Sequence, residues 1–232
     1  MLSDAFYNAW QLLSSWDPEL WFIVWTSLRI SVLAVLLAGI MAVPIGYFIA
    51  SSSFPGRRAL IALLNTMQAI PTVVIGLIFY SLLSRQGPFG FAAMLYTPWA
   101  VVLGEAFLIL PVISAYTMAS VGDIDPRYHK TAKSLGLGKI RTGLLVAREA
   151  RFGIAASVIA GFGRAIGEVG IAMMLGGNIG GFTRTITTAI ALEHNKGNFA
   201  LGLALGFILF CIALLINGLL HLAQGEGRRL GT

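Results

Sequence analysis

Charge and cysteine are both scarce in this chain of 232 residues. Asp, Glu, Lys and Arg together make up 11% of it, whereas hydrophobic residues make up 57%. So little charge excludes an ordinary soluble domain and predicts several membrane-spanning helices. The one cysteine, Cys211, lies in an apolar run, so it forms no intrachain disulfide and we expect no structural zinc site.

Motifs of catalysis are missing as well. No G-x-x-x-x-G-K-S/T phosphate loop occurs, so the chain cannot hydrolyse ATP by that chemistry. His129, His194 and His221 lie in different segments, without the spacing of metal ligands. We therefore expect no catalytic residue, no metal and no cofactor in this chain. The formal net charge of +6 does not indicate binding to nucleic acid, because the distribution of charge matters more than its total in a membrane protein.

Long apolar runs dominate what the sequence does contain. They predict an all-α polytopic membrane protein that forms a single domain over residues 1–232. We expect about five spans, over residues 20–50, 59–83, 97–121, 152–175 and 201–222. Residues 1–19 lack the basic start and the cleavage site of a removable signal peptide. Their aromatic residues predict a helix at the membrane interface.

Lys and Arg residues predict the orientation, because they collect in short cytoplasmic loops. The arginine pairs in residues 51–58 and 225–232 and the many basic residues of segment 122–151 fall on one side of the expected spans. The other side has Arg85, Arg184 and Lys196. We therefore expect the chain in the inner cell membrane, with the N-terminus and residues 1–19 outside and the C-terminus in the cytoplasm.

One long polar and basic stretch, residues 122–151, interrupts the apolar chain. Asp125 and Pro126 predict the start of a helix, and Gly136 predicts its end by taking the left-handed conformation. A second helix is expected to begin at Lys139. The apolar residues of this segment need a partner protein to bury them. The alternative is a basic connector that touches lipid headgroups.

Polar residues inside the expected spans are candidates for a transport path, because polar groups are costly in hydrocarbon. Arg29 lies near the outer end of the first span, and Asn65 and Gln68 precede Pro71 in the second. The alternatives are an arginine that snorkels to the interface and amides that pack helices together. Glu105, in the third span, is expected to be interfacial.

The fourth span and the segment after it hold the remaining candidates. Arg164 and Glu168 are four residues apart on one helix face, so each offsets the cost of burying the other. They predict a gate or, alternatively, a structural ion pair. Residues 176–200 predict an external loop with a short helix over residues 183–192. Its candidates for contact with a tetrahedral oxyanion are Thr183, Arg184, Thr185, Thr187 and Thr188, and the alternative is a threonine-rich helix that packs at the interface.

Segment 122–151 resembles the cytoplasmic EAA loop of the permease subunits of type I ABC importers. The resemblance rests on Lys130-Thr131-Ala132, where the family has Glu-Ala-Ala, and on the positions of Gly136 and Val146. Arg148-Glu149 stands where most of the family has Leu-Pro. Residues 147–193, which begin AREARFGIAASVIAGFGRAIGEVG, resemble the tungstate permeases, close relatives of the molybdate permeases, in which Arg-Glu is an expected variation.

This resemblance covers residues 21–222 and implies the type I permease fold and the import of an oxyanion, tungstate or molybdate, by alternating access. It also implies a homodimer, two ATPase subunits that bind ATP and Mg, and an extracytoplasmic binding protein. Segment 122–151 would be the coupling loop, with docking residues Arg127, Tyr128, Lys130, Ala132, Leu135, Gly136, Leu137 and Ile140. Two alternatives are a permease for another small anion and a proton-coupled secondary transporter that uses Glu105, Arg164 and Glu168.

Overall fold

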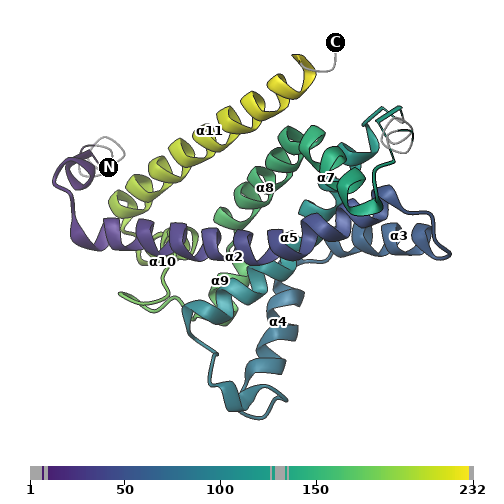
Figure 1. Ribbon diagram of the computed structural model, residues 1–232. Helices are drawn as coiled ribbons and strands as arrows, with labels where there is room; N and C mark the ends of the chain where they lie inside the picture. Colours follow the sequence, from purple (N-terminus) through teal and green to yellow (C-terminus); the bar gives the residue numbers. More distant parts are fainter. Residues whose placement is uncertain (1–6, 8–9, 126, 129–133, 135, 230–232) are drawn as a thin grey trace.

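The computed structural model describes residues 7, 10–125, 127–128, 134 and 136–229, without the side chains of residues 139–140 and 223–229. The elements follow in the order α2 (Pro18–Ser51), α3 (Arg57–Gln68), α4 (Thr72–Leu83), η1 (Gly90–Ala92), α5 (Pro98–Gly122), α7 (Lys139–Glu149), α8 (Arg151–Ile166), α9 (Gly170–Gly176), α10 (Ile186–Lys196) and α11 (Phe199–Arg229). Every regular element in this part of the chain is helical (Figure 1). Lys130, Ala132 and Leu135 lie outside the described residues, as does the side chain of Ile140.

The centre of the molecule is the pair α2 and α5. The Asp17 carboxylate begins α2 by accepting a hydrogen bond from the backbone N–H of Leu20 at 2.9 Å, which satisfies one of the free donors of the first turn. Gly46 lets the two backbones approach closely, since a Cβ atom there would lie 2.5 Å from the carbonyl oxygen of Ser114. The Ser114 hydroxyl donates back to the carbonyl of Ala42 at 3.2 Å. Small residues at such a contact are typical of helix packing in membranes.

The second expected span is not one helix. Residues 59–83 form α3 and α4, which meet at an angle of 97° across Ala69–Pro71. The expected span is therefore broken at Pro71. Pro71 disfavours the helical conformation for Ile70 and cannot donate a backbone hydrogen bond, so the chain ends one helix and starts another. The 12 residues of α4 reach about 18 Å, which is too short to cross a bilayer core of about 30 Å alone.

The fourth expected span is broken in the same manner. Residues 152–175 form α8 and α9, which are bent by 62° at Gly167–Val169. The expected span therefore consists of two helices. Here no proline is present, and the break depends instead on a carboxylate that begins the second helix, as described below.

The last part of the chain packs against the start of α2. The short helix predicted at residues 183–192 is α10, and it begins three residues later, at Ile186, because Thr185 caps it. Buried side chains of α10 and α11, among them Ala189 and Leu205, cluster with Leu20 and Ile23 of α2. The long helix α11 crosses the outside of the bundle diagonally (Figure 1) and is the least buried of the long helices.

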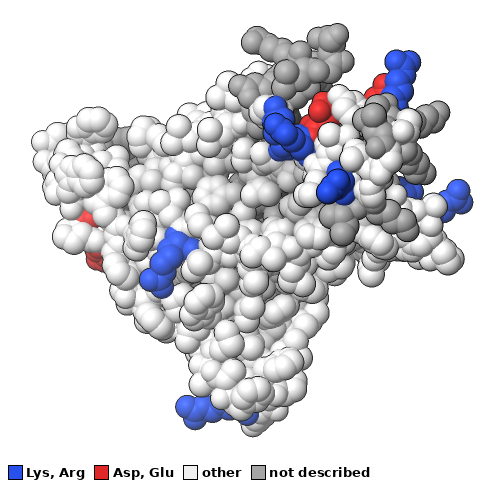
Figure 2. Space-filling view, in the orientation of Figure 1, with Lys and Arg blue, Asp and Glu red and all other residues white. Residues whose placement is uncertain are grey.

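These elements give the expected number of membrane crossings. Helices α2, α5 and α11 are each long and apolar enough to span, and the bent pairs α3–α4 and α8–α9 bring the total to as many as 5 among the described residues. Lys and Arg side chains gather at the end of the molecule that holds α7 and the start of α3 (Figure 2). A broad uncharged band separates this end from the few basic residues elsewhere, as expected for a bilayer-embedded body.

Candidate translocation site and coupling surface

The two helix breaks lie next to each other, at a partly exposed face of the bundle. Gly170 is the first residue of α9 and Thr72 is the first residue of α4. A Cβ atom on Gly170 would lie 2.8 Å from the Thr72 hydroxyl oxygen and 3.2 Å from a methyl carbon of Val73. The two half-helices therefore start side by side. Helix N-termini have a positive electrostatic potential, and transporters use such broken helices to face anions near the middle of the membrane.

Glu168 holds the second break in place. Its side chain is only 3% exposed, and its Oε1 accepts hydrogen bonds from the backbone N–H groups of Gly170 at 2.9 Å and Ile171 at 3.3 Å. Its Oε2 accepts from Arg164 at 3.1 Å. The carboxylate thus satisfies free donors at the start of α9 while it pairs with a cation on α8. The predicted proximity of Arg164 and Glu168 is confirmed, and the arginine side chain remains 43% exposed.

A second carboxylate lies deep in the bundle. Glu105 on α5 is 2% exposed, so the interpretation of this residue as interfacial is wrong. It lies within hydrogen-bonding reach of Ser31 on α2 and close enough to Glu168 to interact electrostatically. Its Oε2 has no hydrogen-bond partner among the described residues. Gly104, the residue before Glu105, lies against Ile171 of α9. Glycine often marks a close contact between membrane helices, so Gly104 is the sequence signal that could have predicted a close helix contact at Glu105.

The threonines of segment 183–188 are buried, and their hydroxyls are occupied within the protein. Thr183 donates to the carbonyl of Gly176, and Thr187 donates to the carbonyl of Glu168 at 2.6 Å. Thr185 and Thr188 form a reciprocal capping box at the start of α10. The hydroxyls therefore hold α10 against the break at Glu168 in this conformation, which favours the packing alternative for them over direct contact with an oxyanion.

Arg184 is also paired with a residue of the protein itself. Its side chain is 16% exposed, and its Nη1 lies 3.3 Å from the carboxylate of Glu19, near the start of α2. Sequence spacing does not reveal this partner, because 165 residues separate the two.

The remaining candidate residues for the transport path lie away from the helix breaks. Asn65 and Gln68 lie exposed on α3, and the Gln68 amide donates to the carbonyl of Leu64 at 3.4 Å. Arg29 is exposed on α2 and lines a separate pocket. Of the ten residues predicted for a path or gate, the structure therefore joins Arg164, Glu168 and Thr187 at the second break. Arg29, Asn65 and Gln68 lie elsewhere.

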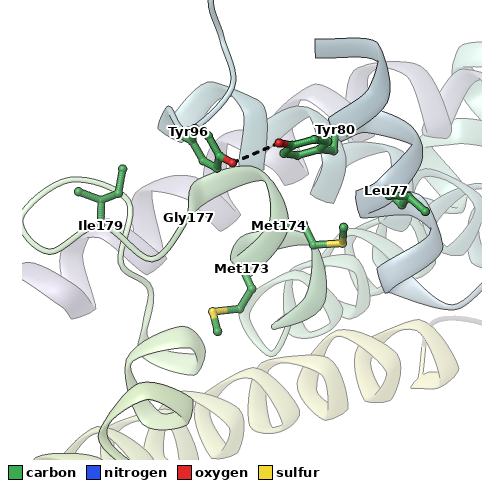
Figure 3. A pocket seen from close by; sticks show the side chains of 7 residues that line it. All are labelled: Leu77, Tyr80, Tyr96, Met173, Met174, Gly177 and Ile179. Atoms are coloured by element: carbon green, nitrogen blue, oxygen red, sulfur yellow. Dashed lines mark hydrogen bonds between the residues drawn. The ribbon is translucent and has the colours of Figure 1, made fainter. Parts of the chain in front are cut away.

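An open pocket of about 640 Å³ lies beside α4 and α9 (Figure 3). Leu77 and Tyr80 of α4, Met173 and Met174 of α9, and Tyr96, Gly177 and Ile179 line it. The Tyr96 hydroxyl donates to the Tyr80 hydroxyl at 3.5 Å. The two aromatic residues close one side of the pocket, and the flexible methionine side chains lie along its floor, where they can re-pack around a passing solute.

The segment predicted to couple to a partner lies at the basic end of the molecule. Gly136 adopts φ +68°, as predicted from its expected left-handed conformation, and α7 begins at Lys139 as expected. Tyr128 lies within hydrogen-bonding reach of the Glu149 carboxylate, and this interaction raises the pKa of the tyrosine phenol. The contact joins the beginning of the segment to the end of α7. Arg127 and Leu144 are exposed, whereas Leu137 is half-buried.

These features define a class of protein. The apolar helical bundle is broken at two neighbouring places, has polar groups at the breaks and has a basic segment at one end. No group of three or more potential metal ligands occurs among the described residues. Such an arrangement is typical of membrane transport proteins, in which broken helices hold and release a polar solute within the membrane.

Comparison with known proteins identifies the family. The profile of the family described as "Binding-protein-dependent transport system inner membrane component" matches residues 42–224. The chain belongs to this family. It is 35% identical to the tungstate uptake system permease protein TupB of Peptoclostridium acidaminophilum over 97% of this chain and 99% of that protein. It is 36% identical to TupB of Campylobacter jejuni over 94% and 91% of the two chains.

A solved structure supports the fold. The permease chain of an amino acid ABC transporter, crystallised with histidines, superposes with a TM-score of 0.63 over 94% of this chain and 96% of that one. The two sequences are 19% identical, so the similarity concerns the arrangement of helices. It confirms the expected fold of a type I ABC importer permease.

Proposed function

We propose that this chain is the permease subunit of an ATP-driven importer of tungstate. The observation that carries the proposal is its similarity to two tungstate permeases over nearly the whole length of each chain. The chain itself has no phosphate loop, so ATP hydrolysis falls to a separate ATPase partner that binds ATP and Mg. An extracytoplasmic binding protein delivers the anion, and two copies of this subunit enclose the path.

The path that we propose runs past the meeting point of the two breaks. Arg164 is the accessible cation there, since 43% of its side chain is exposed. The first turn of α4 adds backbone N–H groups that no side chain caps. Because Glu168 neutralises part of the charge of Arg164, the site attracts a dianion without holding it tightly, as transport requires. Tyr80 and Tyr96 would form the outer side of the path.

Coupling to the ATPase is assigned to segment 122–151. Its basic, exposed surface (Figure 2) lies at the end that we propose to be cytoplasmic, with the N-terminus outside and the C-terminus inside. Movement of the ATPase subunits would reach α8 through α7, because α8 begins at Arg151, two residues after α7 ends. The break at Glu168 lies at the far end of α8. A rotation of α8 would therefore move Arg164 and the start of α9 together.

Transport by the reconstituted complex tests this proposal. The permease is purified with its ATPase partner, placed in liposomes with the binding protein outside, and supplied with radioactive tungstate. We expect uptake that requires internal ATP, persists when an ionophore collapses the proton gradient, and is weakly inhibited by molybdate. Arg164→Gln should reduce uptake at least about tenfold, by loss of a charge-assisted contact, whereas Arg85→Gln, in the exposed loop after α4, should not.

Three results would contradict parts of the proposal. Uptake that follows the proton gradient and ignores ATP would favour a secondary transporter that uses Glu105 and Glu168. Stronger uptake of molybdate than of tungstate would show that molybdate is the substrate. Normal uptake by the Arg164→Gln variant would remove this residue from the path.

A further inference from the structure

A second pocket, of about 620 Å³, lies on the side of the bundle next to α2. Arg29 is its charged residue, and Leu33, Met94, Trp99, Val102 and Phe182 supply most of the apolar wall. This volume is within the range of about 300–1,000 Å³ that is typical of small-molecule sites. A cation at the edge of an apolar cavity fits an amphiphilic ligand with an anionic head.

Arg29 has no partner among the residues that the structure describes. Neither a hydrogen bond nor an ion pair joins its guanidinium to any of the residues that the structure describes. Arg184, by contrast, is paired with Glu19. An unpaired guanidinium on a membrane helix is costly in hydrocarbon, so it requires water, a headgroup or a ligand. Its five donors match a phosphate in a bidentate arrangement.

The surroundings of Arg29 separate it from a path for a hydrated anion. Arg29 lies within an exposed stripe of α2 whose members are spaced three or four residues apart. The stripe consists of Phe22, Trp25, Arg29, Val32, Leu36 and Ile40. Apart from the arginine it is entirely apolar, as a surface in contact with acyl chains would be. A dianion here would lose its hydration to a wall of hydrocarbon and gain a single cation.

Tryptophans place the pocket at headgroup depth. Trp25 is 62% exposed and lies one helical turn before Arg29, and Trp99, in the first turn of α5, is 56% exposed. Exposed tryptophan collects where the hydrocarbon meets the lipid headgroups. Arg29 is therefore level with lipid phosphates, and the pocket extends from this level toward the acyl chains.

We propose that this pocket binds one phospholipid of the adjacent leaflet, with its phosphate on Arg29 and the upper part of an acyl chain between Leu33, Val102 and Phe182. The lipid would cover the gap between α2, the start of α5 and the segment that contains Phe182. It would thereby brace the loop that ends at Tyr96, beside the pocket of Figure 3. The proposal concerns the face of the bundle and does not depend on which anion is transported.

Native mass spectrometry of the whole complex tests the proposal. The complex is delipidated in detergent, titrated with 1-palmitoyl-2-oleoyl phosphatidylglycerol, and analysed for bound lipid. We expect one lipid per permease chain to remain bound under conditions that remove the others. Arg29→Ala should weaken its binding at least about tenfold by loss of the charge-assisted contact. Ala92→Trp, which fills the pocket from its exposed rim and keeps Arg29, should do the same.

The matched control is Arg85→Ala, which removes an exposed arginine from the loop after α4 and should leave lipid binding unchanged. Unaltered lipid binding in both the Arg29→Ala and Ala92→Trp variants would overturn the proposal. So would displacement of the lipid by tungstate together with loss of tungstate uptake in Arg29→Ala, since this would assign the arginine to the anion path. Disulfide cross-linking between two copies of an Ala92→Cys variant would instead make the pocket a subunit interface.

Discussion

Removal of the Glu168 side chain should destabilise the protein far more than removal of Arg164, although the two form one ion pair. The carboxylate is 3% exposed, whereas the arginine side chain is 43% exposed. Solvent screens the pair from the arginine side, so the pair itself contributes about 0.5–1 kcal/mol. Glu168 also accepts two backbone hydrogen bonds that begin α9. Hydrogen bonds to a charged group contribute about 1.5–3 kcal/mol each.

Both backbone donors use the same oxygen, and the bond from Ile171 is long at 3.3 Å. We therefore count them together as about 2–3 kcal/mol. Glu168→Ala should lower the free energy of unfolding by about 3 kcal/mol, and Arg164→Ala by about 1 kcal/mol, since the carboxylate keeps its backbone donors. Glu168→Gln should fall between the two, because an amide oxygen still accepts from Gly170 but without charge.

Unfolding of the purified protein from mild detergent into sodium dodecyl sulfate, followed by the loss of helical signal or by proteolysis, gives these free energies. Equal destabilisation by Arg164→Ala and Glu168→Ala would show that the ion pair, and not the cap of α9, holds the break. A Glu168→Ala variant as stable as the parent protein would refute the entire account of the bend.

Three further predictions concern packing, the coupling segment and pH. Gly46→Ala should lower the free energy of unfolding by about 1–3 kcal/mol, because the added methyl group forces α2 away from α5. This change should appear as a lower Tm, whereas Gly39→Ala, with open space around it, should leave Tm unchanged. Gly136→Ala should destabilise the local turn by about 1–2 kcal/mol because φ is positive there, and it should reduce substrate-stimulated ATP hydrolysis by the complex. The raised pKa of Tyr128 predicts that its contact with Glu149 persists below pH 10 and is lost as pH rises through the higher folded value, which ultraviolet titration of tyrosinate would follow.

Each of these has an outcome that contradicts it. Equal lowering of Tm by Gly46→Ala and Gly39→Ala would mean that α2 and α5 do not approach each other as described. Normal stimulation of ATP hydrolysis in the Gly136→Ala variant, with Gly138→Ala as the control at an ordinary φ of −65°, would remove the turn from coupling. A tyrosinate titration unaltered by Glu149→Gln would exclude the hydrogen bond as the cause of the raised pKa.

The number and order of the spans could be predicted from the sequence because they depend on local hydrophobicity. Both α2 and α5 begin and end within two residues of the predicted limits. The positive φ of Gly136 was also predictable, since few other residues adopt that conformation. The ion pair of Arg164 and Glu168 follows from spacing on a helix alone, although the spacing does not reveal that the carboxylate also begins a new helix.

The features that sequence reasoning missed depend on contacts between distant parts of the chain. Apolar composition continues through both helix breaks, so residues 59–83 and 152–175 each resemble one span. The bend at Pro71 is stabilised by α9, and the bend at Glu168 by Thr187, whose hydroxyl donates to the Glu168 carbonyl. The partner of Arg184 could not be predicted because Glu19 lies 165 residues away along the chain. The threonine hydroxyls bond to nearby residues, but only once the chain has folded back at Gly176 and Glu168.

The buried position of Glu105 has a consequence for how the protein is made. A carboxylate within a membrane helix opposes insertion, by up to about 2.5–3.5 kcal/mol when it lies at the centre of an isolated segment. Ser31 and the rest of α2 are synthesised before α5, so they are already in the bilayer when Glu105 leaves the ribosome. Insertion of α5 against α2 gives the carboxylate its hydroxyl neighbour at once. The order of the helices along the gene therefore lets an acidic segment enter the membrane beside the surface that receives it.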